Sequence, residues 1–122
     1  MSTDARHRLG VLGERLAAEH LVRRGFQILE RNYRTRWGEL DIIAYDGRTL
    51  AFCEVKTRMH GGGIPFDAIR RAKRARIRKL AGTWMNERTA RPYAAAIRCD
   101  AIAVTFDRDG RLAAIEHLEA AF

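Results

Sequence analysis

The fold is decided by one stretch of the sequence, GELDIIAYDGRTLAFCEVKT, which spans residues 38–57. Residues 38–45 and 49–57 are rich in aliphatic, β-branched and aromatic side chains, and each run has the length of one strand. Asp46 and Gly47 lie between the runs, and Asp-Gly in this position is a strong hairpin signal. We therefore expect an antiparallel hairpin with a two-residue turn, in which Tyr45 pairs with Arg48.

The alternation of side chains along this hairpin predicts which of them share a face. With a two-residue turn, Asp41 lies opposite Phe52, and Glu39 lies opposite Glu54. Asp41, Glu54 and Lys56 then point to one side of the hairpin, and the apolar side chains between them point to the other. A change of one residue in the turn would move Asp41 to the opposite face.

Three carboxylates and one ammonium group on a single face suit a divalent cation. Like charges that lie opposite each other destabilise a sheet, so Glu39, Asp41 and Glu54 need a cation between them. Carboxylate oxygens are common ligands of Mg²⁺ and Mn²⁺. Lys56 could position a water molecule or neutralise charge that develops on a phosphate. On spacing alone, pairing of these acids with nearby arginines at the surface is an equally good interpretation.

Outward from the hairpin, helical and strand patterns alternate. Apolar residues recur at helical spacing over residues 3–24, Gly25 stands where a helix would end, and Glu14 falls at the border of the apolar stripe. The other expected elements are a strand over residues 26–34, a glycine-rich loop over 59–65, a helix from Pro65 to about residue 86, and strands over 94–106 and 112–118. The order αβββαββ predicts an α/β fold with a mixed β-sheet flanked by helices.

Length and composition indicate one basic domain over residues 1–122. The chain has 23 Lys plus Arg against 15 Asp plus Glu, a net charge of +8, and a length sufficient for one core. No apolar run approaches the roughly 18 residues of a membrane-spanning helix, and residues 1–8 contain no signal-peptide pattern. We therefore expect a cytoplasmic protein without a membrane partner. Cys53 and Cys99 lack metal-binding spacing and are expected to be buried thiols.

The positive charge is concentrated on the helix that follows the glycine-rich loop. Between residues 70 and 79 there are seven basic residues and no acidic one, which favours a polyanionic partner such as nucleic acid. A solvated helix face without a partner is the alternative. The candidate nucleic-acid-binding residues are Arg70, Arg71, Lys73, Arg74, Arg76 and Arg78, together with Arg58.

These basic residues divide into two sets on a helical projection. Arg70, Arg74 and Arg78 form a row that points away from the apolar stripe, where it is free to meet phosphates. Lys73 and Arg76 fall inside the apolar arc, so they either lean towards the candidate site or extend past the core to solvent.

The two tryptophans differ in their surroundings along the chain. Trp84 lies in a helical apolar stripe and is expected in the core. Trp37, beside Gly38, is the better candidate for stacking on a nucleobase.

Several of these motifs resemble those of known nucleases. Asp41 lies thirteen residues before the triplet Glu54-Val55-Lys56, with Glu14 on a preceding helix, and this resembles the PD-(D/E)xK pattern. More closely, GELDIIA at residues 38–44, FCEVKTR at 52–58, RNYR at 31–34, Gly-Glu at 13–14 and Ala-Phe at 121–122 resemble the YraN-like family of small bacterial proteins. This resemblance covers nearly the whole chain.

The resemblance implies the fold of restriction-endonuclease-like enzymes and Holliday-junction resolvases. It implies metal-binding roles for Asp41 and Glu54, a catalytic role for Lys56 and an auxiliary role for Glu14. Leu40 stands where the wider superfamily often has proline. Cys99 interrupts an expected Arg-Phe-Asp at residues 98–100, which leaves the packing of that strand open.

Together these observations predict an endonuclease that requires Mg²⁺ or Mn²⁺ and hydrolyses a phosphodiester in DNA, with branched and single-stranded forms among the candidate substrates. The alternative is a nucleic-acid-binding protein that keeps the nuclease fold without catalysis. A homodimer is compatible with the sequence, because junction-resolving enzymes cut two strands symmetrically.

Overall fold

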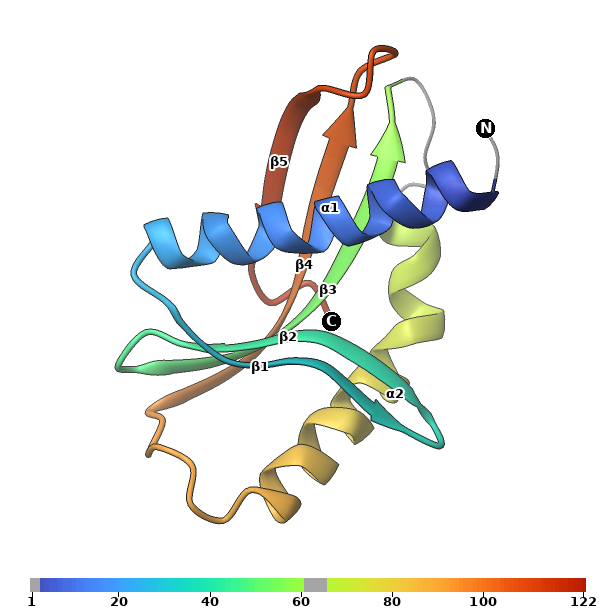
Figure 1. Ribbon diagram of the computed structural model, residues 1–122. Helices are drawn as coiled ribbons and strands as arrows, with labels where there is room; N and C mark the ends of the chain where they lie inside the picture. The colour runs from blue at the N-terminus through green and yellow to red at the C-terminus, as the bar shows by residue number, and fades with distance from the viewer. Residues whose placement is uncertain (1–2, 61–65) are drawn as a thin grey trace.

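The structure, a computed structural model, describes residues 3–60 and 66–122, with side chains described over the same ranges except 66–72. Within these residues the chain follows the predicted order αβββαββ (Figure 1). The elements are α1 (Thr3–Arg23), β1 (Gln27–Thr35), β2 (Gly38–Tyr45), β3 (Thr49–Met59), α2 (Phe66–Glu87), β4 (Ala96–Phe106) and β5 (Leu112–Leu118). The predicted α/β class is thus confirmed. The expected loop over 59–65 lies largely outside the described residues.

The five strands form one mixed sheet in the order β1-β2-β3-β4-β5. Only β3 and β4 are parallel, and α2 makes the crossover between them, because parallel neighbours cannot be joined by a tight turn. Helix α1 crosses one face of the sheet and α2 packs against the other (Figure 1). Neither helix, over the residues described, is long and apolar enough to cross a membrane.

Each helix covers its own apolar core. The cluster under α1 includes Leu21, Ile42 and Cys53. The cluster under α2 includes Phe52 and Trp84, whose rings contact edge to face with their centroids 5.6 Å apart. Residues 42 and 53 therefore face α1, whereas residue 52 faces α2, as the alternation of the hairpin predicted. Trp84 is in the core, as expected, and both cysteines are buried free thiols.

The turn between β2 and β3 is longer than predicted. Tyr45 pairs with Leu50 rather than with Arg48, so four residues lie between the paired positions. Hydrogen bonds of Asp46 close this connection: its Oδ1 accepts from the backbone N–H groups of Arg48 (2.9 Å) and Thr49 (2.6 Å), and its own N–H donates to the Thr49 carbonyl at 3.2 Å. The register moves by two residues, and an even shift leaves every side chain on its predicted face of a regular strand.

An irregularity interrupts β1 and β2 near the candidate site. Asn32 adopts a left-handed φ of 54°, a conformation that asparagine tolerates better than most residues. The register of the two strands brings Asn32 opposite Asp41, between the regular pairs Arg31–Ile42 and Tyr33–Leu40. Leu40 packs under α2 while Ile42, two residues later, packs under α1. The strict alternation assumed from the sequence therefore fails at Asp41.

The strand whose packing the sequence left open is anchored by a buried carboxylate, Asp100. Its oxygens accept hydrogen bonds from Arg98 Nε at 2.8 and 3.1 Å and from the backbone N–H of Ala120 at 2.9 Å, and one lies 2.8 Å from His117 Nε2. Burial alone favours the neutral acid, but the contacts with His117 and Arg98 lower the pKa of Asp100 below its usual range. This charged cluster ties the C-terminal residues to β4. No pattern in the sequence predicted it.

Candidate active site

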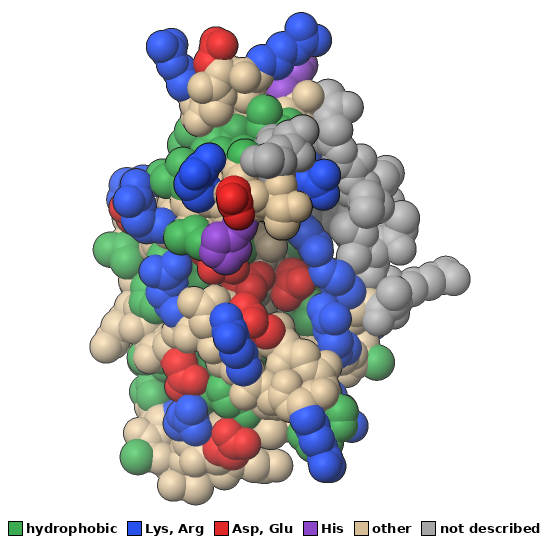
Figure 2. Space-filling model, turned by 45° about the vertical axis from the view of Figure 1, so that its right-hand side comes forward, with side chains coloured by type: hydrophobic (Ala, Val, Ile, Leu, Met, Phe, Trp, Pro, Cys, Tyr) green, Lys and Arg blue, Asp and Glu red, His purple; other side chains and the backbone are tan. Residues whose placement is uncertain are grey.

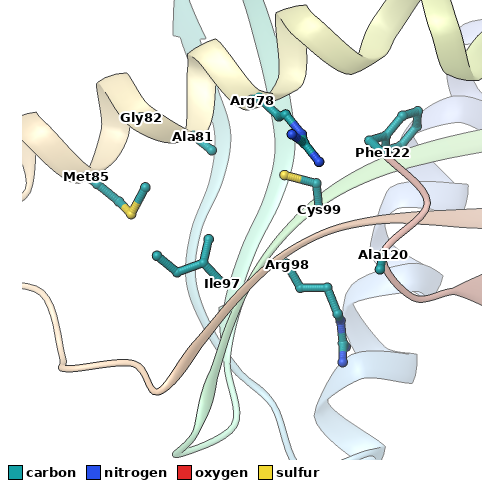
Figure 3. A pocket seen from close by; sticks show the side chains of 9 residues that line it. All are labelled: Arg78, Ala81, Gly82, Met85, Ile97, Arg98, Cys99, Ala120 and Phe122. Carbon is teal, nitrogen blue, oxygen red and sulfur yellow. The ribbon is translucent and has the colours of Figure 1, made fainter.

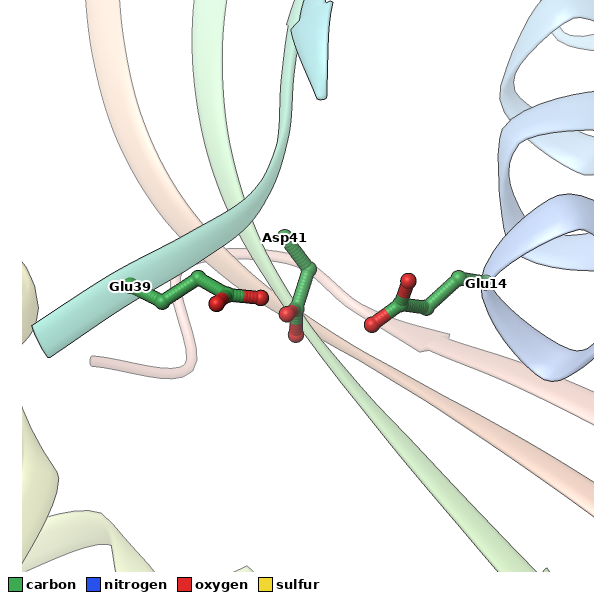
Figure 4. Close-up of side chains that lie close together, drawn as sticks. All are labelled: Glu14, Glu39 and Asp41. Atoms are coloured by element: carbon green, nitrogen blue, oxygen red, sulfur yellow. The ribbon is translucent and has the colours of Figure 1, made fainter. Parts of the chain in front are cut away.

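Three acidic side chains from two elements come together beside the sheet. Glu14 on α1 and Glu39 and Asp41 on β2 each offer a carboxylate oxygen, and these oxygens lie within 4.8 Å of one another. Figure 4 shows the three carboxylates turned towards a common point, with Asp41 in the middle. All three side chains are half-buried. Of the His, Cys, Asp and Glu side chains that the structure describes, only this group has the spacing of a metal site. We call it the acid trio.

Glu14 reaches the trio because α1 approaches the sheet closely at Gly13. A Cβ atom at Gly13 would overlap the Thr57 side chain of β3, so only glycine allows this distance between helix and strand. The following residue, Glu14, then stands at the border of the buried helix face, as expected from the sequence. The dipeptide Gly13-Glu14 thus combines a close approach to β3 with a carboxylate that lies beside Glu39 and Asp41 of β2.

Asp41 lies where the pairing of β2 with β3 stops. The backbone ladder ends at Ile42–Cys53, and beyond it the Asp41 Oδ2 accepts a hydrogen bond of 2.7 Å from the Val55 N–H. Burial raises the pKa of Asp41 to about 7, with a further contribution from the nearby charge of Glu54, while the Val55 hydrogen bond acts in the opposite direction. The pKa of Glu14 is also raised, by burial and then by the charge of Glu39. The acid trio therefore favours either a proton or a bound cation.

Glu54 lies in a second cluster, which faces α2. The Glu54 Oε1 is 2.8 Å from Lys73 Nζ, 3.7 Å from Arg76 Nη2 and 4.0 Å from Lys56 Nζ. Only 7% of Glu54 is exposed. Lys73 and Arg76 thus reach a carboxylate from inside the apolar arc of α2, as the sequence hypothesis proposed. Burial, followed by the hydrogen bond with Lys73, lowers the pKa of Lys56 from its ordinary value.

The structure therefore divides the predicted acids into two groups. The sequence placed Glu39, Asp41, Glu54 and Lys56 on one face, and this was wrong for Glu39 and Asp41, which meet Glu14 of α1. The alternation of β2 breaks at Asp41, opposite the left-handed Asn32, because Leu40 packs under α2 whereas Ile42 packs under α1. The two groups stay electrostatically connected, because the charge of Glu54 raises the pKa of Asp41.

One side chain that contacts the acid trio, Arg34, was not predicted from the sequence. Arg34 pairs with Glu39 across β1 and β2, and its Nε lies 3.0 Å from the Glu39 carboxylate. The signal was present, because the short turn between the strands puts these two residues opposite each other. Arg31 also acts on the trio, and its charge lowers the pKa of Glu14 against the raising effect of burial.

The predicted nucleic-acid-binding residues have different surroundings. Arg74 and Arg78 are exposed on α2, as expected, while the side chains of Arg70 and Arg71 lie outside the described residues. Arg58 turns away to β4 and β5, where it donates to Thr105 Oγ1 at 3.0 Å and pairs with Glu116 at 3.5 Å. Figure 2 shows acidic side chains gathered in the middle of one face, with Lys and Arg side chains on both sides of them.

A separate pocket of about 320 Å³ lies between α2, β4 and the C-terminus. Figure 3 shows Arg78, Cys99 and Phe122 around it, with Ile97 and Met85 at its apolar end. None of the predicted acids lines this pocket, and Arg98, one of its two arginines, is bound to Asp100. The predicted acids therefore lie outside this pocket.

Comparison with known proteins identifies relatives along almost the whole chain. The pattern of uncharacterised protein family UPF0102 matches residues 13–104, a span that contains the acid trio, Glu54, Lys56 and most of β4. A UPF0102 protein of Beutenbergia cavernae is 44% identical over 115 residues, covering 93% of this chain and 95% of the relative. A UPF0102 protein of Pelotomaculum thermopropionicum is 42% identical over 120 residues, covering 98% of both chains.

Proposed function

The chain belongs to UPF0102, an uncharacterised protein family, and on that premise we propose from the chemistry of its site that it is a metal-dependent endonuclease acting on DNA. The family resemblance expected from the sequence is thereby confirmed. The activity is our inference from the residues. The observation that carries it is the acid trio, which brings three carboxylate oxygens within 4.8 Å of one another.

The donor set of the trio fits Mg²⁺ or Mn²⁺. These ions prefer oxygen ligands, and Glu14, Glu39 and Asp41 supply oxygen atoms that are already close enough to share one ion after small side-chain movements. The raised pKa of Asp41 means that the folded protein resists a bare negative charge there. A divalent cation, when bound, supplies the charge neutralisation that hydrolysis of a phosphodiester requires.

Lys56 and Glu54 add a basic group, and a carboxylate that positions it, to the proposed site. Lys56 borders both groups of acids, and its lowered pKa brings it nearer to exchanging a proton with water or substrate. Its ammonium form can stabilise negative charge that develops on the phosphate. Glu54 holds Lys56, Lys73 and Arg76 around one oxygen and so fixes their positions beside the trio.

The charge distribution favours DNA as the substrate. Exposed Arg74, Arg78 and Lys79 continue along α2 from the cations that surround Glu54, which gives the backbone of a polyanion a path towards the acids. Such phosphate contacts position a strand without reading its bases.

Cleavage by purified protein tests the proposal. We expect nicking of junction, flap or single-stranded DNA in Mn²⁺ or Mg²⁺, with RNA substrates in the same panel for comparison. Asp41→Ala and Lys56→Ala should each abolish it. Asp109→Ala, which removes an exposed acid in the β4–β5 turn, is the matched control and should cleave normally. Equal cleavage by all variants would assign the activity to a contaminant.

A second candidate function, nucleic-acid binding without catalysis, is favoured by one observation. The Glu54 carboxylate is already neutralised by three cations, so it needs no metal ion for its charge balance. Calorimetry separates the two functions. An endonuclease requires Mn²⁺ or Mg²⁺ binding, with and without DNA, that is lost in Asp41→Ala. Absence of any such binding would leave nucleic-acid binding as the function.

A further inference from the structure

Trp37 is presented at the surface by the turn that joins β1 to β2. The Thr35 hydroxyl accepts a hydrogen bond of 3.0 Å from the Trp37 N–H and donates one of 3.3 Å to the Gly38 carbonyl, so the turn is fixed on both sides of the indole. Trp37 is 41% exposed and belongs to neither apolar core. The aromatic surface of Trp37 therefore takes no part in the apolar packing of the fold.

The contacts of the indole ring are cationic. Lys79 Nζ lies 4.3 Å and Arg36 Cζ 4.5 Å from the ring centroid, both within the range of a cation–π contact. Both cations are themselves exposed, so either can move from the ring to a phosphate at little cost. A nucleotide offers both required groups, a flat base for the ring and a phosphate for the cations.

Trp37 also stands next to the proposed catalytic groups. The neighbouring Gly38 packs on the Arg76 side chain, since a Cβ atom built there would lie 3.2 Å from Arg76 Cδ. Arg76 in turn reaches Glu54 at 3.7 Å. In the other direction along the chain, Glu39 of the acid trio is two residues away. The indole therefore borders the place where the basic surface of α2 meets the acids.

We propose that Trp37 is a stacking platform for an unpaired nucleobase whose neighbouring phosphate is held by the cations of α2 beside the acid trio. This inference rests on the proposed function and specifies its substrate as single-stranded nucleic acid, or the unpaired segment of a branched one. Stacking of a base on an aromatic ring is stronger than an exposed cation–π contact, so a base can displace a cation from the ring. Bases inside a duplex are already stacked on each other and gain little from Trp37.

Binding is measured with a fluorescein-labelled oligothymidylate and a labelled duplex of equal phosphate number, in EDTA so that neither is cut. Trp37→Ala should weaken oligothymidylate binding roughly 5- to 100-fold and change duplex binding less than about 2-fold. Trp37→Phe should retain part of the affinity. Tyr93→Ala removes a more exposed aromatic ring between α2 and β4, and it should change neither affinity.

Fluorescence gives a second readout, because the chain has two tryptophans and Trp84 is buried. Oligothymidylate should quench the emission of the wild type, and the quenching should be lost in Trp37→Phe. A polyglutamate peptide of equal charge provides phosphate-like charge without bases, and its affinity should not depend on Trp37.

The outcomes distinguish this inference from the proposed function. If Trp37→Ala binds oligothymidylate as the wild type does, or loses duplex and polyglutamate binding to the same extent, stacking is refuted while nucleic-acid binding stands. If the wild type binds neither oligothymidylate nor duplex, the proposed function fails and this inference fails with it.

Discussion

Asp41 is the residue at which the two charged clusters meet. It accepts a hydrogen bond from Val55, lies among the carboxylates of Glu14 and Glu39, and responds to the charge of Glu54. No lysine or arginine donates a hydrogen bond to Asp41 among the described side chains. The Val55 hydrogen bond positions the Asp41 carboxylate, but no basic side chain that the structure describes pairs with it directly. Ionisation of Asp41 should therefore have a measurable effect on the free energy of unfolding.

The raised pKa of Asp41 predicts a stability that falls as the pH rises. The folded pKa is about 7 and the ordinary value 3.8, so between these values the folded protein binds a proton that the unfolded chain has lost. The Asp41→Asn variant has no carboxylate at this position, so its stability does not decrease through ionisation there as the pH rises. In EDTA, urea denaturation should find the variant increasingly more stable than the wild type from pH 4 to pH 8, by up to about 4 kcal/mol.

The same variant provides a metal control. At pH 8, Mg²⁺ or Mn²⁺ at about 100 times its dissociation constant should stabilise the wild type by about 2.7 kcal/mol. Asp41→Asn should show a much smaller gain. A stability difference between the two proteins that does not change with pH would contradict the assignment of the titrating group to Asp41.

At the scale of elements, the site depends on how closely α1 lies on the sheet. Gly13 sets this distance and Glu14 uses it, whereas a Cβ atom at Gly10, one turn earlier on the same helix, would meet no atom within 4 Å. The two glycines are thus a matched pair. One is required by packing, and the other only lowers helix stability.

We predict opposite effects for alanine at these two positions. Gly13→Ala should destabilise the protein by about 1–3 kcal/mol, because its Cβ overlaps Thr57, and should weaken Mn²⁺ binding by moving Glu14. Gly10→Ala should stabilise it by about 0.5–1 kcal/mol and leave Mn²⁺ binding unchanged. Urea denaturation and calorimetry measure both quantities. Equal stability changes at the two positions would refute the role of Gly13 as a spacer.

Helix α2 is the element that we expect to contact the DNA backbone. Replacing Arg70, Arg74 and Arg78 by glutamate should weaken DNA binding and flatten the dependence of log K on log salt, by about 0.9 for each phosphate that the helix no longer neutralises. The fold should be retained, because Arg74 and Arg78 are exposed. Affinity measured at several salt concentrations gives the slope.

A control for net charge exists in the turn between β4 and β5. Arg108→Glu with Arg111→Glu reverses two exposed charges in the β4–β5 turn, without touching α2. This variant should lower affinity through net charge alone, and its salt slope should remain close to that of the wild type. If its slope flattens as much as that of the α2 variant, the positive charge acts as a whole and α2 has no special role.

At the scale of the whole molecule, periodicity predicted the elements and their layers. The helical spacing in α1 and the alternation in β2 and β3 are properties of neighbouring residues, so the sequence displays them directly. The left-handed Asn32 and the four-residue connection at Asp46 depend on single backbone conformations and hydrogen bonds. No periodic pattern records these features, and for this reason the division of the acids into two clusters was not predicted.

The reaction rates of the two buried thiols can distinguish local opening from global unfolding of the protein. Cys53 is 0% exposed at the centre of the sheet, and Cys99 borders the pocket shown in Figure 3. Burial raises the pKa of both thiols, so neither should react quickly in the native state. In pulsed alkylation followed by mass spectrometry, Cys99 should react first through local opening, and Cys53 only at the rate of global unfolding. Identical rates would contradict this order.

The parallel pairing of β3 with β4 also has a kinetic consequence. Every pair in it, from Thr49–Ala96 to Met59–Phe106, joins residues that are 47 positions apart. The pairs of the β1-β2-β3 meander are far more local, and local contacts close faster during folding. We expect the β1-β2-β3 part of the sheet, which carries Glu39 and Asp41, to form early during folding, while the edge of β3 that later pairs with β4 is still unpaired. The step that completes the protein is the long loop closure that brings β4 to that edge.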